Sequence, residues 1–392
     1  MKFAVLSHVL PPASSGQAVM LYRILSGFAP ENYYLISREK YEQREDTNFF
    51  LSGNYYALQP FKYLFLLNKY GFAIIRDIST IVLSILSRTR QIRKIMRYHP
   101  VDVLVACSGD IADIPAGFIA SSTLRIPFIA YLFDDYVYQW TGIYRLFARV
   151  VSPFIFRRCA GIIGPNEFIC NEYLQRYDVK YALVRNPVDQ DELKKPVYYR
   201  WPSEEGKIAI TYTGAIYRAN YDCFQNLVRV LDMLQEPRVE LHIFTSQTAE
   251  QLTAQGIHGE RVYVHSHVPH TEVLEHQRKA DILFLPLAFE TPISEVIRTS
   301  APGKLAEYLA SGRPILAHVP ADSFVAGYLE KNQCGLIASK NDSVDLKAHI
   351  LNLINDKSLR SEIIHNARQR ARLDFDAEVA RKRFADFLFT AI

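Results

Sequence analysis

Segment 300–317, which reads SAPGKLAEYLASGRPILA, holds the residues whose types and spacing could do the clearest chemistry. Ser300 can cap a helix, Pro302 is tolerated in the first turn of that helix, and Gly312 would end it before the next strand. The amino end of this helix, around Gly303, would present free backbone N–H groups and the positive end of the helix dipole. These features suit the binding of a diphosphate.

Two charged side chains in the same segment extend this prediction. Lys304 adds a full positive charge at the amino end of the predicted helix. Glu307 lies three residues further on the same helical face, where its carboxylate can accept two hydrogen bonds from a ribose diol. One helix could therefore hold both halves of a nucleoside diphosphate. The alternative is a solvated Lys304–Glu307 ion pair, as in an arbitrary helix.

The elements that must position this helix alternate along the chain. Near-continuously apolar strands separated by helices are typical of an open, doubly wound parallel sheet, so the fold class is predicted to be α/β. In the first half, strands are predicted at 2–8, 33–37, 101–108, 127–133, 161–164 and 181–185, with a helix at 18–28. In the second half, strands are predicted at 207–213, 239–244, 261–265, 281–287, 314–318 and 335–338, and helices at 222–234, 271–279, 302–310 and 343–355.

The chain of 392 residues is too long for one ordinary hydrophobic core. The alternation stops where Asp, Glu, Lys and Pro cluster after Asn186 and resumes at Gly206. We therefore expect an amino-terminal domain over 1–188, a linker over 189–205 and a second domain over 206–375.

The pattern Ser-x-Pro-x-Lys-x-x-Glu-Tyr-x-Ala-x-Gly-[Lys/Arg]-Pro-[aliphatic] in segment 300–315 closely resembles the donor-site motif of the group-1 retaining glycosyltransferases. This GT-B-fold family includes glycogen and sucrose synthases and many cell-envelope sugar transferases. The resemblance implies two Rossmann-like domains facing across a cleft that holds the active site, with the final helix, 376–392, packed back on the first domain. It also implies a hexosyltransferase that moves a sugar, with retention of configuration, from a nucleotide sugar to a glycan or lipid-linked acceptor in polysaccharide or glycolipid biosynthesis.

Other segments resemble the family in the same order along the chain. The loop 11–17, with Gly16, is similar to the family loop where backbone N–H groups approach the donor phosphates or the acceptor, although a plain strand-to-helix turn is the alternative. Segment 211–218 is similar to the first strand and turn of the second domain. There the resemblance assigns close approach to Gly214 and a contact with the diphosphate to Arg218, for which a surface arginine is the alternative.

The chain also departs from the family pattern. Family members often carry Glu-x7-Glu ending at the position of Glu307, but the first of these positions is Thr299 here. The contact with the transferred sugar is therefore expected to pass to backbone groups or to Glu295. A family histidine after strand 127–133 is replaced by Asp134-Asp135, of which Asp134 could orient a sugar hydroxyl or the acceptor. Adjacent residues point apart and GT-B enzymes generally need no bound metal, so neither a metal nor a cofactor is expected.

Charge and cysteine content bear on partners and location. Net charge is +4, and the positive residues concentrate in two amphipathic stretches, Arg76, Arg88, Arg90, Arg93, Lys94 and Arg97 in one and Arg145, Arg149, Arg157 and Arg158 in the other. These stretches are either solvated faces over an ordinary core or surfaces that dock on an anionic membrane; nucleic acid is not expected. The five scattered cysteines and the absence of a signal-like apolar run predict a cytoplasmic protein, with a peripheral place on the inner membrane face as an extension.

Two other classes of function remain open at this stage. One is a non-transferring nucleotide-sugar enzyme, such as an epimerase or a phosphorylase, and the other is a catalytically inactive GT-B binding scaffold. A dinucleotide-dependent dehydrogenase fits poorly, because the first strand is not followed by Gly-x-Gly-x-x-Gly.

Overall fold

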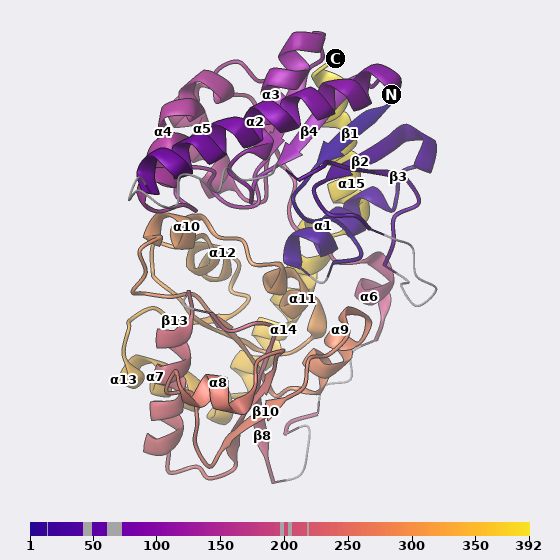
Figure 1. The fold of residues 1–392 in the computed structure, drawn as a ribbon. Helices are drawn as coiled ribbons and strands as arrows, with labels where there is room; N and C mark the ends of the chain where they lie inside the picture. Colours follow the sequence, from indigo (N-terminus) through magenta and orange to yellow (C-terminus); the bar gives the residue numbers. More distant parts are fainter. Residues whose placement is uncertain (14, 42–48, 61–72, 197–199, 203–205, 218) are drawn as a thin grey trace. The chain divides into compact units, whose positions relative to one another are not determined.

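The computed structural model describes residues 1–392 apart from 14, 42–48, 61–72, 197–199, 203–205 and 218. The chain divides into two compact units (Figure 1). Unit 1 comprises Met1–Pro187 and Ala377–Ile392, and unit 2 comprises Val188–Asp376. Each unit contains one parallel sheet with helices between successive strands, which confirms the predicted α/β class and the two doubly wound sheets.

The sheet of unit 1 has the strand order β3-β2-β1-β4-β5-β6-β7, and every pair is parallel. Its strands are β1 (Phe3–Leu6), β2 (Tyr33–Ser37), β3 (Asn54–Ala57), β4 (Val103–Cys107), β5 (Phe128–Tyr131), β6 (Gly161–Gly164) and β7 (Tyr181–Leu183). Its helices are α1 (Gly16–Leu25), the 3-10 helix η1 (Pro30–Asn32), α2 (Ala73–Tyr98), α3 (Asp113–Leu124), α4 (Gly142–Phe156), α5 (Glu167–Tyr177) and α15 (Ala377–Thr390).

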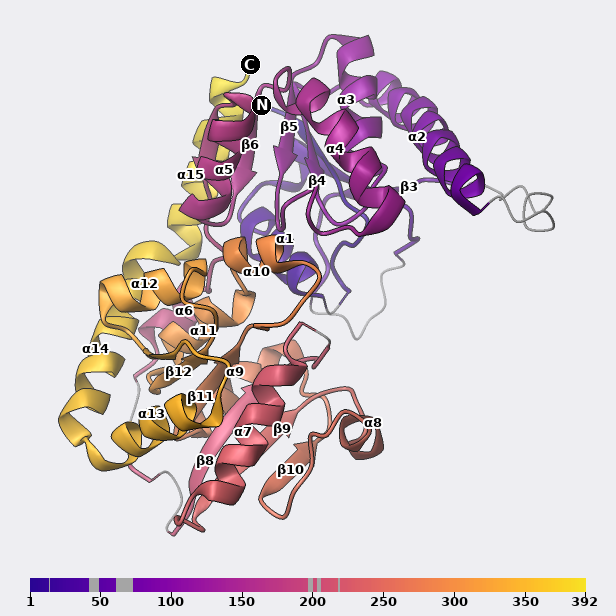
Figure 2. The same cartoon turned by 90° about the vertical axis from the view of Figure 1, so that its left-hand side faces the viewer.

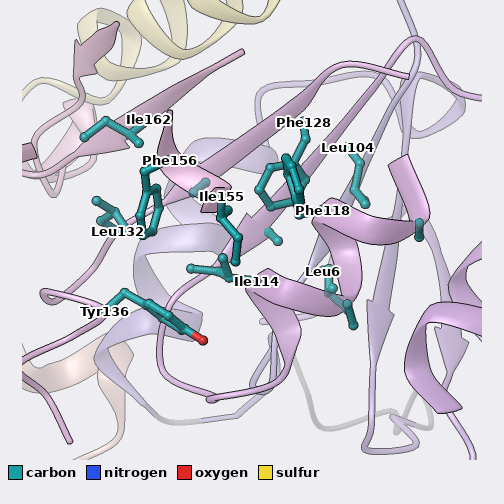
Figure 3. Close-up of a cluster of buried hydrophobic side chains, with 14 of the residues drawn as sticks. Leu6, Leu104, Ile114, Phe118, Phe128, Leu132, Tyr136, Ile155, Phe156 and Ile162 are labelled. Atoms are coloured by element: carbon teal, nitrogen blue, oxygen red, sulfur yellow. The ribbon is translucent and has the colours of Figure 1, made fainter. Parts of the chain in front are cut away.

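Alternate side chains of the central strands divide the core of unit 1 into two layers. Leu104 of β4 faces a layer built from α2, α3, α4 and α5, whereas Val105 faces α1 and α15. In the first layer Phe118 of α3 packs edge-to-face on Phe128 of β5, with 5.7 Å between the ring centroids (Figure 3). Helices α2 to α5 therefore cover one face of the sheet and turn their outer sides to the surface (Figure 2).

The sheet of unit 2 has the order β10-β9-β8-β11-β12-β13, again with parallel pairs. Its strands are β8 (Ile208–Thr213), β9 (Val239–Phe244), β10 (Val262–His265), β11 (Ile282–Pro286), β12 (Ile315–His318) and β13 (Leu336–Ala338). Its helices are α6 (Gln190–Lys194), α7 (Tyr221–Met233), α8 (Ala249–Thr253), α9 (His270–Lys279), α10 (Ser294–Thr299), α11 (Gly303–Ser311), α12 (Phe324–Asn332), α13 (Ser343–Asn355) and α14 (Lys357–Asp374).

The segment expected to be a linker, 189–205, is structured in part and belongs to unit 2. It contains α6, where Glu192 pairs with Arg278 at 2.9 Å. Arg368 of α14 donates hydrogen bonds to the carbonyl oxygens of Leu193 and Lys195. The end of α6 is thus held by two other helices of its own unit.

The last helix of the chain, α15, packs in unit 1. Phe384 is buried in the core layer on the α1 side of the sheet. Arg381 donates hydrogen bonds to the Arg23 carbonyl oxygen at 2.9 Å and to Ser26 Oγ at 3.0 Å, both at the end of α1. The chain therefore passes from unit 1 to unit 2 after Pro187 and returns after Asp376.

None of the helices in the described ranges combines the length and the apolar character that a bilayer-spanning segment requires.

Candidate functional site

The sheet of unit 2 reverses its winding beside its first strand. From β8 the chain builds β9 and β10 on one side and then β11, β12 and β13 on the other. In open α/β sheets, ligands bind outside the carboxyl ends of the strands at such a reversal. Gly214 follows β8 directly, and α10 and α11 follow β11, so the predicted site residues of this unit derive from the two strands that border the reversal.

Lys304 and Gly214 come together at this place although 90 positions separate them. A Cβ atom built at Gly214 would lie 2.8 Å from both Cε and Nζ of Lys304, and Gly214 has a φ of +124°, which side chains rarely adopt. The missing side chain thus gives Lys304 its space. The ammonium also lies 5.1 Å from the centroid of the Tyr212 ring, in a cation–π arrangement.

No acid among the described residues neutralises the charge of Lys304. Lys304 makes no ion pair with any described residue, and this includes Glu307, which lies one turn further on α11. The alternative of a solvated Lys304–Glu307 pair therefore does not describe this helix. A partly exposed ammonium over a glycine turn is available for an anion from outside the chain.

Helix α11 begins later than the sequence predicts. Its N-cap is Pro302, with φ −61° and ψ 135°, and Gly303 is its first residue. Ser300 instead ends α10, where its N–H donates to the Ile297 carbonyl oxygen, so the prediction that Ser300 caps this helix is wrong. The physical reason is that a residue before proline disfavours the helical conformation, so Ala301 cannot begin the helix.

The amino end of α11 is open. No side chain caps it, because proline at the N-cap has no acceptor. The N–H groups of Gly303 and Lys304 find no acceptor in the described part of the chain, and residues 300–304 are all partly exposed. The backbone donors and the dipole of this helix end are thus free to bind an anion.

The Glu307 side chain is held by a hydrogen bond from Gln277, a residue that the sequence analysis did not single out. Gln277 of α9 is fully buried and donates hydrogen bonds from Nε2 to Glu307 Oε2 at 3.2 Å and to Thr213 Oγ1 at 3.0 Å. Glu307 is itself buried, with 8% of the residue exposed. Gln277 thereby fixes the carboxylate to the end of β8.

Thr299 and Glu295, the two residues considered for a contact with the transferred sugar, differ in placement. Thr299, at the position of the missing glutamate, turns its hydroxyl back on α10 and donates to the carbonyl oxygens of Glu295 and Val296. Glu295 lies partly buried in the first turn of α10, where Ser294 Oγ donates to its Oε2 at 3.4 Å. Neither side chain hydrogen-bonds to Lys304 within the described residues. Arg218 lies outside the described residues.

Unit 1 has its own winding reversal, between β1 and β4, and polar residues gather at the carboxyl ends of these strands. A Cβ atom at Gly109, after β4, would collide with the His8 imidazole, after β1. Gln17 Nε2 in the first turn of α1 donates to Ser7 Oγ at 2.9 Å. Burial lowers the pKa of His8, so its imidazole is neutral at pH 7, and its Nδ1 is buried without a hydrogen-bond partner.

The neighbouring carboxylates are held by arginine. Arg88 of α2 contacts Asp110 and lies 2.5 Å from Asp113 Oδ1. Burial works against ionisation of Asp110, but the charges of Arg88 and Arg38 outweigh it and lower the pKa of Asp110. This buried ion cluster fixes the loop that carries Gly109 and Asp110 next to His8.

Asp134 follows β5, the next strand along the sheet. Its N–H and that of Phe133 donate to Ser108 Oγ at 3.3 and 2.9 Å, so the loop lies against the end of β4. The Asp134 carboxylate has no hydrogen-bond or ion-pair partner among the described residues. Burial, together with the charge of Asp135, raises the pKa of Asp134 to about 6.

Asp135 is turned away from Asp134. Its Oδ1 accepts hydrogen bonds from the N–H groups of Val137 and Tyr138, and its other oxygen contacts Arg176. The two adjacent carboxylates therefore do not form a shared site. In the described ranges no group of three or more His, Cys, Asp or Glu side chains is arranged to hold a metal.

Gly16 is the first residue of α1 and is exposed. A Cβ atom at Gly16 would meet no atom within 4 Å, so the packing of this chain does not itself require glycine there. The helix end is capped by Ser15, whose Oγ accepts from the Ala18 N–H at 3.2 Å. Only a ligand that approaches the backbone closely would therefore require glycine at position 16.

Comparison with known proteins identifies the unit that holds Lys304 and Glu307. Residues 207–356 match the family model described as glycosyl transferases group 1. Most of the second unit is therefore similar in sequence to the group 1 glycosyl transferases. No curated protein is detectably similar to the chain in sequence.

Solved structures assign a fold to the whole chain. Sucrose-phosphate synthase from Thermosynechococcus elongatus matches with a TM-score of 0.74 at 13% identity, covering all of both chains. Anabaena HepE in complex with UDP-glucose matches with a TM-score of 0.69 at 14% identity, also over all of both chains. WaaG, a glycosyltransferase involved in lipopolysaccharide biosynthesis, matches with a TM-score of 0.65 at 15% identity, covering 98% of this chain and 99% of its own. The chain therefore has the GT-B fold.

Three polar residues of the candidate sites were missed from the sequence: His8 and Asp110 in unit 1 and Gln277 in unit 2. His8 and Asp110 each follow an apolar strand, so the position of polar residues at strand ends was a usable signal for both. Gln277 gave no such signal, because one glutamine inside an amphipathic helix is ordinary. Its role depends on the packing of α9 against α11 and β8.

Gly214→Ala is expected to displace the Lys304 ammonium. We expect the free energy of unfolding to fall by about 1–3 kcal/mol from backbone strain at positive φ, and sugar-transfer activity to fall by about tenfold or more because Lys304 loses its position. Urea denaturation and initial rates measure the two effects. Gly256→Ala is the matched control, because Gly256 has a φ of +72° but no atom within 3.4 Å of its Cβ position. This variant should lower the free energy of unfolding and leave the activity unchanged. Full activity of a folded Gly214→Ala protein would contradict the role of this glycine.

Asp134→Asn is expected to stabilise the protein in a pH-dependent way. A carboxyl whose pKa rises from 3.8 unfolded to about 6 folded destabilises the fold once it ionises. The penalty is small near pH 4, grows through pH 4–6 and is complete above it, so the variant should gain about 1–3 kcal/mol near pH 7.5 and little near pH 4. Urea denaturation at the two pH values measures the gain, with exposed Asp322→Asn as control. An equal gain at both pH values would show that Asp134 carries no such penalty.

Proposed function

We propose that this chain is a retaining hexosyltransferase that moves a sugar from a nucleotide-sugar donor to an acceptor. The observation that carries the proposal is the amino end of α11, where Lys304 lies over Gly214 without an ion-pair partner among the described residues and Glu307 follows one turn later. The structure of HepE in complex with UDP-glucose, a protein of the same fold, supports a donor of this class.

In this proposal the donor diphosphate binds at the amino end of α11. The N–H groups of Gly303 and Lys304 and the Lys304 ammonium contact the phosphate oxygens, with Ser300 and Pro302 shaping the approach and Arg218 adding a second positive charge. Glu307, fixed by Gln277, accepts hydrogen bonds from the ribose diol. Glu295 or backbone groups contact the transferred sugar.

Chemistry then proceeds on one face of the sugar. The bond from the anomeric carbon to the diphosphate oxygen breaks, the acceptor oxygen forms its bond to the same face, and the acceptor proton passes to the departing phosphate oxygen. Charge grows on the leaving diphosphate, so the groups that stabilise it lower the barrier. No protein nucleophile and no bound metal take part in this proposal.

Unit 1 is proposed to receive the acceptor. His8, neutral at pH 7, lies at its winding reversal, and Asp134, whose carboxylate has no partner among the described residues, follows the neighbouring strand β5; both could orient acceptor or sugar hydroxyls. The exposed Gly16 leaves backbone donors accessible at the start of α1. The acceptor is a glycan or a lipid-linked glycan, and the reaction belongs to polysaccharide or glycolipid synthesis at the cytoplasmic side, where nucleotide sugars are found.

A donor panel tests the proposal. The purified chain is incubated with several NDP-sugars and candidate acceptors, and released nucleotide is measured. Acceptor-dependent release, with an α-configured product from an α-configured donor by NMR, is the expected result. Conversion of the donor sugar without an acceptor would indicate an epimerase, dependence on phosphate would indicate a phosphorylase, and binding without turnover would indicate an inactive scaffold.

A further inference from the structure

Helix α2 exposes apolar side chains that the core does not use. Its buried residues, such as Ile85 and Ile92, pack under the sheet of unit 1. Ile74, Ile75, Ile78, Val82 and Leu86 are nevertheless exposed, from 39% to 63%. In Figure 2 the amino-terminal end of α2 extends past the strands of unit 1, which explains why this half of the helix has no covering layer.

Helix α4 carries a second exposed apolar stripe. Leu146, Val150 and Phe154 follow one another at i, i+4 and i+8, so they share one face of the helix. They are 57%, 69% and 55% exposed. The opposite face of α4 is buried through Ile155 and Phe156 in the core. The stripe is therefore an outer face and not part of a core.

The two stripes belong to one layer. Helices α2 and α4 contact each other on the same face of the sheet, with α3 between parts of them (Figure 2). Ile119 of α3 adds a further exposed apolar side chain. We call the outer sides of α2 and α4 the α2/α4 surface.

Exposed positive residues lie on the same two helices as the exposed apolar side chains or directly after them. They are Arg90, Lys94 and Arg97 in the carboxy-terminal half of α2, Arg149 of α4, and Arg157 and Arg158 directly after α4. Helix α4 contains no acidic residue, and α2 contains one, Asp77. Asp77 forms an ion pair with Arg76 at 2.9 Å. Arg88 is not part of this surface, since it is buried against Asp110 and Asp113.

We propose that the α2/α4 surface docks on an anionic lipid bilayer. Apolar side chains with exposed arginine and lysine beside them, and almost no acid, are complementary to anionic headgroups above an acyl layer. A solvated face over an ordinary core, the other interpretation of the two basic stretches, does not account for the exposed Val150 and Ile74. The proposal concerns binding alone and does not rest on the proposed transferase activity.

Vesicle flotation of the full chain tests this surface. Vesicles of phosphatidylcholine alone are compared with vesicles that contain phosphatidylglycerol, at low and moderate salt. We expect binding to the anionic vesicles that weakens as salt rises. Because each basic residue near the bilayer contributes about 1 kcal/mol, Arg149→Glu/Arg157→Glu should lower the partition coefficient by more than about tenfold.

A second variant and a matched control separate surface from fold. Leu146→Ser/Val150→Ser removes exposed apolar groups without charge change and should also weaken binding. Val344→Ser and Lys331→Glu, exposed in unit 2, should bind like the unchanged protein. Circular dichroism confirms that each variant folds.

Three results would overturn the proposal. One is no flotation with anionic vesicles, and another is equal flotation with the α2/α4 variants and the unchanged protein. The third is self-association in light scattering that Leu146→Ser/Val150→Ser abolishes while vesicle binding is absent, which would assign the surface to a second copy of this chain. Each readout is independent of sugar transfer, so a negative result here leaves the proposed activity to its own test.

Discussion

Lys304→Ala is expected to lower the turnover of sugar transfer by about 10²–10³-fold, because removing one preorganised donor from developing charge costs about 3–4 kcal/mol. The ammonium lies over Gly214 and Tyr212, and no acid in the described part of the chain neutralises it, so its charge is available to a bound diphosphate. Stability should change little, since the side chain is partly exposed and makes no ion pair in the described part of the chain. Initial rates at saturating donor measure the effect.

Two further variants sharpen this result. Lys304→Arg keeps the charge but not its compact shape, and should recover only part of the activity, because the space above Gly214 is fitted to an ammonium. Lys331→Ala, on the exposed side of α12, is the matched control and should be fully active. Turnover of Lys304→Ala within about twofold of the unchanged protein would remove Lys304 from the reaction.

Glu307→Ala is expected to lose donor affinity and rate together. Two charge-assisted hydrogen bonds to the ribose diol are worth about 3 kcal/mol or more, so kcat/KM should fall by about 100-fold. The variant also leaves Gln277, which donates to Glu307 Oε2, without that acceptor, so urea denaturation is measured alongside. Glu307→Gln retains an acceptor for Gln277 and should lose activity with little loss of stability.

A donor that lacks one ribose hydroxyl isolates this contact. With the unchanged protein, the 2′-deoxy or 3′-deoxy form of the accepted donor should react more slowly than the normal donor. With Glu307→Ala the deoxy penalty should disappear, because the lost hydroxyl no longer has a partner. Glu330→Ala, an exposed acid of α12, should retain the full penalty. A deoxy penalty that is the same with and without Glu307 would place the ribose elsewhere.

Most of the fold follows from local sequence pattern. Strands β6 and β9 and helix α13 have the predicted bounds, because their apolar residues are continuous or regularly spaced and turn residues flank them. Strand β3 was missed, since Asn54–Ala57 is a partly exposed edge strand with little alternation. The long helix α14 was also missed, because only four of its 18 residues are buried and only one of these, Ile363, is a large apolar residue.

The site was predictable in composition but not in arrangement. Lys304 and Glu307 stood out through their spacing, and Gly214 through its turn, yet no local pattern indicates that Gly214 makes room for Lys304. Gln277 and His8 gain their roles from contacts between elements far apart in sequence. The N-cap of α11 was misplaced by two residues, at Ser300 in place of Pro302, because the effect of Pro302 on Ala301 outweighed the capping preference of Ser300.

The central claim is that a diphosphate binds at the amino end of α11. The most direct measurement is a titration of protein labelled with ¹⁵N-glycine and ¹⁵N-lysine with UDP, GDP and ADP in turn, followed by amide NMR. We predict that at least one nucleotide gives its largest shifts at the Gly303 and Lys304 amides, and that Lys304→Ala weakens this binding by about tenfold or more. If all bound nucleotides left these two amides unshifted and perturbed glycine or lysine amides elsewhere, the assigned site would be wrong.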